Sequence, residues 1–108
     1  MPSVAGSFRI AGPGTTFWTN FVIDEITHSF QGTLGGTSVE PCDGVVTLTY
    51  DDPGQLTSTR DFSGIVGRTT TKITVANGVE IAGPLNNPIS IANNVTGTGR
   101  WGVTKFDN

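Results

Sequence analysis

Residues 45–50 read VVTLTY and residues 71–75 read TKITV. Both runs alternate between apolar and polar side chains and are rich in β-branched residues, a pattern typical of half-buried β-strands. The turn sequence DDPG follows the first run at residues 51–54, and an Asn-Gly pair follows the second at residues 77–78. Asn-Gly between two alternating runs is the strongest short-range signal for a β-hairpin, because a type I′ turn needs positive φ at both positions. No window shows the apolar i, i+3, i+4, i+7 spacing of an amphipathic helix, so the sequence predicts an all-β protein.

Other alternating runs predict the remaining strands. They cover residues 4–10, 17–23, 26–30, 56–66 with a bend at Ser63-Gly64, 69–75, 79–81, 89–92 and 99–106, with brief pairing at 37–40. In the second of these runs, Phe17, Phe21 and Ile23 are expected in the core, because side chains alternate between the two faces of a strand. Trp18 is then expected on the opposite face with Asn20.

We expect a single domain over residues 1–108, built as a small antiparallel closed β-barrel of seven to eight strands. A two-sheet β-sandwich is the alternative, since both architectures protect strand edges. Glycines inside or beside the strands, such as Gly32, Gly64, Gly97 and Gly99, favour the barrel, because tightly coiled strands need glycine kinks.

Composition excludes several partners. Six basic and nine acidic residues give a formal charge of −3 without a Lys/Arg cluster, so we expect no nucleic-acid partner. No apolar stretch approaches the roughly 20 residues of a membrane helix, and no leader segment is visible. We therefore expect a soluble protein with no membrane partner, either cytoplasmic or mature secreted. No metal or cofactor motif is present, and Cys42, the one cysteine, allows no intrachain disulfide.

Three segments resemble a known family. Residues 26–40 read ITHSFQGTLGGTSVE, residues 61–69 read DFSGIVGRT and residues 97–101 read GTGRW. They resemble the strand and turn patterns of small bacterial β-barrels similar to allene oxide cyclase, a calycin-like family, with Thr69 in place of the usual glycine. The resemblance implies an eight-stranded barrel with an apolar lumen open at one end, in a group whose members cyclise hydrophobic substrates or have no assigned activity. The segment between Glu40 and Arg60 is shorter than in that family, and no catalytic residue is carried over.

The candidate catalytic residues are Glu25 and His28. A carboxylate at a barrel mouth, with its pKa raised by apolar neighbours, would serve as a general acid or base, although a solvated turn carboxylate is the simpler interpretation. His28 is the only histidine, and a lone imidazole is equally explained as a core or rim residue. The candidate ligand-binding residues are aromatic side chains, the lone histidine and one arginine: Trp18, His28, Phe30, Tyr50, Arg60, Phe62 and Trp101.

Two function hypotheses follow. The first is a small-ligand-binding barrel with an apolar lumen, with a cyclase- or isomerase-like reaction on a hydrophobic substrate left open. The second is a non-enzymatic structural subunit that self-assembles through strand edges into a homo-oligomer, filament or virion component. It rests on the low content of charged residues, 14% against about 25% in ordinary domains. A carbohydrate-binding module with exposed tryptophans on a β-surface is a third option.

Overall fold

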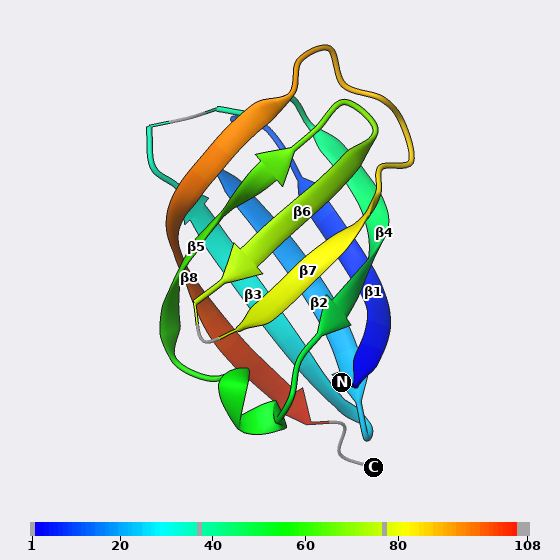
Figure 1. The fold of residues 1–108 in the computed structure, drawn as a ribbon, viewed down its shortest axis with the longest axis vertical. Helices are drawn as coiled ribbons and strands as arrows, with labels where there is room; N and C mark the ends of the chain where they lie inside the picture. The colour runs from blue at the N-terminus through cyan, green and yellow to red at the C-terminus, as the bar shows by residue number, and fades with distance from the viewer. Residues whose placement is uncertain (1, 37, 77, 106–108) are drawn as a thin grey trace.

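The chain folds into one closed barrel of eight antiparallel strands (Figure 1). The computed structural model describes residues 2–36, 38–76 and 78–105. The strands are β1 (Ser3–Ile10), β2 (Thr16–Ile23), β3 (Ile26–Leu34), β4 (Cys42–Thr49), β5 (Thr59–Val66), β6 (Thr70–Val75), β7 (Val79–Pro84) and β8 (Asn93–Lys105). The closed barrel confirms the predicted fold class over the two-sheet sandwich.

The strand order is two Greek keys joined into a ring. Around the barrel the strands follow the order β1-β2-β3-β8-β5-β6-β7-β4. Strands β1, β2 and β3 form one meander, and β4 returns to pair with β1; β5, β6 and β7 form the second, and β8 returns to pair with β5. In each unit the fourth strand lies beside the first, which defines a Greek key. The two returning strands also pair across the units, β8 with β3 and β4 with β7, and so close the barrel.

Both ends of the barrel are covered by buried side chains. The long returns, of which residues 35–36, 38–41 and 85–92 are described, lie at one end (Figure 1), where Val39 and Ile89 are buried. The start of β1, the end of β8 and the 3₁₀ helix η1 (Pro53–Gln55) lie at the other end, and Leu56 and Tyr50 on either side of η1 are buried. Within the described residues, no helix has the length and apolar character needed to cross a membrane.

Alternation on β2 follows the prediction. Phe17 and Phe21 are fully buried inside the barrel, Ile23 is half-buried at its end, and Trp18 and Asn20 are on the outer face. The interior of the other strands is equally apolar, with Phe8, Ile10, Phe30, Leu34, Val46, Leu48, Phe62, Val66, Ile73, Val75, Val79, Ile81, Val95 and Trp101 buried.

Several inward-facing glycines make room for phenylalanine rings. Gly32 on β3 is the register partner of Phe17, and a Cβ at this position would overlap the Phe17 ring. A Cβ at Gly99 on β8 would likewise overlap the ring of Phe30, although the register partner of Gly99 on β3 is Gly32. Aromatic side chains that cover glycines on adjacent strands stabilise tightly curved sheets, because the ring fills the space of the missing side chain. These glycines therefore serve the packing of the core as well as the curvature.

Several predicted segment boundaries are wrong, among them the ends of the runs predicted at 26–30, 45–50 and 79–81, which form β3, β4 and β7 with other bounds. Strands were predicted at 89–92 and 99–106, but residues 89–92 are a loop and residues 93–105 form one continuous strand. The strand begins at residue 93 because the backbone of β8 pairs with both β3 and β5, whatever its local apolar content. Residues 56–58 precede β5, which crosses Ser63-Gly64 without interruption. Residues 38–40 form no strand, and Thr37 lies outside the described residues.

The predicted hairpin between β6 and β7 is confirmed, but three residues separate its paired strand ends, one more than in the predicted type I′ turn. Val75 pairs with Val79, and Gly78 in the turn has φ of +85°. Asn77, the other residue of the predicted turn, lies outside the described residues, as does Phe106 of the last predicted strand.

Candidate functional site

The inside of the barrel holds a cluster of five aromatic rings. Phe17 lies 5.6 Å from Phe8, 5.8 Å from Phe30 and 5.0 Å from Phe62 between ring centroids. Trp101 extends the cluster, 4.8 Å from Phe30. These separations are those of aromatic side chains in direct contact. Of the predicted ligand-binding residues, Phe30, Phe62 and Trp101 therefore pack against one another where a ligand in the lumen would lie.

The other predicted interior residues lie nearer the η1 end of the barrel. Tyr50 is buried, and the half-buried Arg60 donates from Nε to the carbonyl oxygen of Thr57 at 3.1 Å. Neither side chain lines the outer pocket described below. Tyr50 and Arg60 therefore lie away from Trp18.

His28 lies inside the barrel, whereas Glu25 lies exposed in the turn between β2 and β3. His28 faces inward and is 8% exposed, and burial lowers the pKa of its imidazole. Its Nδ1 atom has no hydrogen-bond partner among the described residues, and the same is true of Nε1 of Trp101. Glu25 is exposed in the β2–β3 turn, with φ of +67°. A general base needs a hydrogen-bonded partner that holds its proton in place, and the described contacts provide none at Nδ1.

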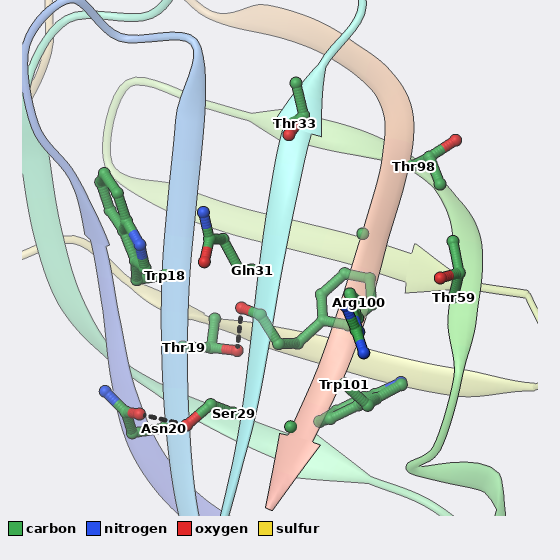
Figure 2. Close-up of a pocket in the computed structure, with 13 residues that line it drawn as sticks. Trp18, Thr19, Asn20, Ser29, Gln31, Thr33, Thr59, Thr98, Arg100 and Trp101 are labelled. Carbon is green, nitrogen blue, oxygen red and sulfur yellow. Dashed lines mark hydrogen bonds between the residues drawn. The ribbon is translucent and has the colours of Figure 1, made fainter.

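A solvent-open pocket of about 600 Å³ lies on the outer face of β2, β3 and β8 (Figure 2). We call it the Trp18 pocket. Trp18 stands on its β2 side and Arg100 on its β8 side. Most of the other side chains around it are uncharged hydrogen-bonding groups that point outward from the barrel: Asn20, Ser29, Gln31, Thr33, Thr59 and Thr98. The edges of Phe30 and Trp101 also reach the pocket from the core.

Strand register places four of these side chains in one row. Trp18 pairs with Gln31, Gln31 pairs with Arg100, and Arg100 pairs with Thr59. Directly paired residues point to the same face of a sheet, and neighbouring strands lie about 4.7–4.9 Å apart. The row therefore presents an indole, an amide, a guanidinium and a hydroxyl side by side.

Hydrogen bonding in the pocket leaves donors available to a ligand. Ser29 Oγ donates to Asn20 Oδ1 at 2.6 Å, as Figure 2 shows. Since this bond uses the oxygen of the Asn20 amide, the two N–H donors of that amide remain. Gln31, on the strand beside Trp18, is exposed and keeps both donor and acceptor capacity.

Charged side chains are scarce in the lining of the Trp18 pocket. Arg100 is the only ionised side chain among the residues that line it. Glycoside hydrolysis and most acid–base chemistry need one or two carboxylates beside the scissile bond, and the described lining supplies none. Within the described residues, no three His, Cys, Asp or Glu side chains gather as metal ligands. The thiol of Cys42 is also poorly ionised, because burial, and then the charges of Asp43 and Glu40, raise its pKa.

The sequence predicted Trp18, Phe30 and Trp101 as ligand-binding residues of a lumen; all three line this outer pocket instead, and the polar residues around them were not predicted. Asn20, Gln31 and Arg100 each occupy an outward position of an alternating strand. The direction of each side chain could therefore be predicted from the sequence. Their convergence depends on pairings between β3 and β8, which are about 70 residues apart in the chain. No local pattern carries that information.

Fold and pocket together define a closed Greek-key β-barrel with a solvent-open pocket on its outer wall. No protein-family model matches the chain, and no curated protein or solved structure matches it either. The resemblance to allene-oxide-cyclase-like barrels therefore stays a prediction.

Proposed function

We propose that this protein is a binding barrel that holds a neutral, hydroxyl-rich small ligand, a carbohydrate, in the Trp18 pocket. The observation that carries the proposal is Trp18 itself. Its side chain is 40% exposed, and it is the only aromatic among the exposed large apolar residues in the described part of the chain. An indole held half in water on a rigid strand presents a large apolar face at little conformational cost.

The surroundings of Trp18 match the chemistry of a sugar. One face of a pyranose ring carries C–H groups that pack on an aromatic ring, whose face is electron-rich. The hydroxyls around the sugar both donate and accept hydrogen bonds, as the amides of Asn20 and Gln31 and the hydroxyl of Thr59 do. Binding sites of this kind combine an apolar surface with a few fixed polar groups.

A hydrophobic ligand inside the barrel is the competing location. Such a ligand would have to displace rings that contact one another, such as Phe17 and Phe62 with centroids 5.0 Å apart. It would also have to pass the buried side chains at either end of the barrel. Packed interiors resist added volume at a cost of about 1–3 kcal/mol even for single methylene groups. The outer pocket is already open, so we place the ligand there.

Self-association remains a second prediction, and the closed sheet restricts the surfaces through which it could occur. Each of the eight strands is hydrogen-bonded to a neighbour on both sides, and a closed barrel offers no free edge to another chain. A homo-oligomer would therefore have to use outer faces, where Val45 and Ile65 are exposed.

A disaccharide titration tests the proposed function. Isotope-labelled protein is titrated with cellobiose, maltose, xylobiose, mannobiose and chitobiose while amide and indole resonances are recorded. We expect at least one sugar to shift the Trp18 indole signal and amides of Gln31 and Arg100. Substitution Trp18→Ala should weaken that sugar at least about tenfold, as truncation of an aromatic anchor does.

Val22→Ala is the matched control. Val22 is also exposed on the outer face of β2 but does not line the Trp18 pocket, so its removal should leave the dissociation constant unchanged. The proposal is wrong if none of the five sugars shifts these signals, or if Trp18→Ala, with a folded spectrum, binds as tightly as the parent protein.

A further inference from the structure

A second pocket lies on the other side of Trp18. It has a volume of about 660 Å³, opens to solvent over β1, β2 and β4, and shares Trp18 and Asn20 with the first. We call it the Arg9 pocket, and its other polar side chains are Ser7, Arg9, Asp43 and Asn86. Trp18 is therefore the ridge between two open pockets rather than the end wall of one.

Strand register joins the two pockets into a single track. Arg9 pairs with Trp18 on one side and with Asp43 on the other. Together with the row of the Trp18 pocket, this gives one line of outward side chains across six strands: Asp43, Arg9, Trp18, Gln31, Arg100 and Thr59. Five strand spacings of about 4.8 Å make the track roughly 24 Å long, measured along the curved surface.

We propose that the ligand is a linear oligosaccharide that runs across the strands, stacks one sugar on Trp18 and occupies both pockets. This inference rests on the proposed function, and it adds the length and direction of the ligand. A single sugar in either pocket would leave the other face of the Trp18 ridge in water. A chain that crosses the ridge covers the indole and reaches polar groups on both sides.

The chemistry at the far end of the track suits sugar hydroxyls. The two oxygens of the Asp43 carboxylate are hydrogen-bond acceptors, and the amide of Asn86 has both donor and acceptor groups. The backbone N–H of Asn86 donates to the carbonyl oxygen of Asp43 at 2.8 Å, so the two side chains are held on adjacent segments. Carboxylate and amide side chains side by side match the alternating donors and acceptors of vicinal hydroxyls.

An extended peptide fits this track less well. Peptides that bind β-sheets gain most of their affinity by adding a strand to a free edge. Strand β1 pairs with β2 and β4, and β2 pairs with β1 and β3, so the backbone groups along the track are already used. The occupant must be recognised through side chains on the outer face, as hydroxyl groups are.

Ligand length is the experimental variable that tests this inference. Cellobiose, xylobiose and chitobiose are compared with their tetra- and hexasaccharides by calorimetry and amide shifts. We expect the hexasaccharide of the bound series to bind at least about tenfold more tightly than the disaccharide and to shift Val45 and Asn86 in addition to the Trp18 pocket. Substitution Asn86→Ala should weaken the hexasaccharide about two- to tenfold, the effect of one lost hydrogen bond, and leave the disaccharide unchanged.

Asn87→Ala is the control, because Asn87 is an exposed neighbour that does not line the Arg9 pocket. Equal affinity for all chain lengths, with shifts confined to the Trp18 pocket, would overturn the extended track and leave the proposed function standing. The extended track is also wrong if Asn86→Ala and Asn87→Ala bind the hexasaccharide alike. Absence of binding by every sugar would overturn the proposed function itself.

Discussion

Replacing Gly32 with alanine should destabilise the barrel by about 1–2 kcal/mol, although the change adds a single methyl group. Gly32 lies inside β3, and a Cβ there would overlap the ring of Phe17 on β2. Movement of the ring is restricted, because it contacts the rings of Phe8, Phe30 and Phe62. The substitution therefore measures whether the interior of the barrel is full.

The magnitude comes from two opposing contributions. Alanine lowers the conformational entropy of the unfolded chain and would stabilise an unstrained site by about 0.4–1 kcal/mol. Extra volume in a well-packed core costs about 1–3 kcal/mol, and the cost is the larger of the two. Gly102→Ala is the matched control, because Gly102 is an exposed strand glycine and a Cβ there would meet nothing within 4 Å. It should be neutral or slightly stabilising.

Urea unfolding followed by tryptophan fluorescence gives both free energies, and a double mutant isolates the cause. In a Phe17→Leu background the smaller side chain leaves room for the methyl group, so the cost of Gly32→Ala should fall, with a coupling of about 0.5–3 kcal/mol typical of contacting residues. A Gly32→Ala variant as stable as Gly102→Ala, without coupling to Phe17, would refute the reasoning. The interior would then have spare room, and a ligand in the lumen would become the better hypothesis.

Two further outcomes are expected. Phe62→Ala should lower the free energy of unfolding by about 3–5 kcal/mol and leave an apolar cavity, so that benzene raises the melting temperature of the variant but not of the parent protein; equal shifts in both would contradict a filled interior. Burial lowers the pKa of His28 below its ordinary value of 6.5, so the unfolded chain binds this proton more tightly than the folded protein does. The contribution of His28 is thus present above pH 6.5 and lost as the pH falls through the lowered folded pKa. Urea midpoints at pH 5 and 7.5 should differ less in His28→Gln than in the parent protein, and an unchanged difference would exclude this role.

Local pattern was enough to predict which face of β2 is buried. The alternation of β2 places Phe17 and Phe21 inside and Trp18 outside, as predicted, because side-chain direction depends only on the two-residue repeat of the strand. The β6–β7 hairpin could also be predicted from local sequence, because its strands are adjacent in the chain and the turn residues have their own conformational preference. These features needed no knowledge of distant partners.

Strand order depends on contacts that no local window contains. Residues 93–98 read NNVTGT, which resembles a loop, yet they lie within the longest strand because β5 pairs with them along their full length. The positions to which β4 and β8 return decide which strands are neighbours, and long-range packing determines those positions. Whether the lumen is hollow also depends on the strand order, since only the final arrangement of the strands brings the phenylalanine rings together.

The position of Trp18 is the clearest physical evidence for a role on the outer wall. Burying a tryptophan removes a large apolar surface from water and stabilises the fold substantially, and Phe17 and Phe21 on the same strand are fully buried. A tryptophan that points the other way gives up part of that stabilisation. Nothing in the barrel requires it, since the outward positions nearby carry Asn20, Ser29 and Gln31. A large aromatic side chain among small polar ones contributes most when another molecule covers it, and the two pockets on either side of Trp18 leave room for that molecule.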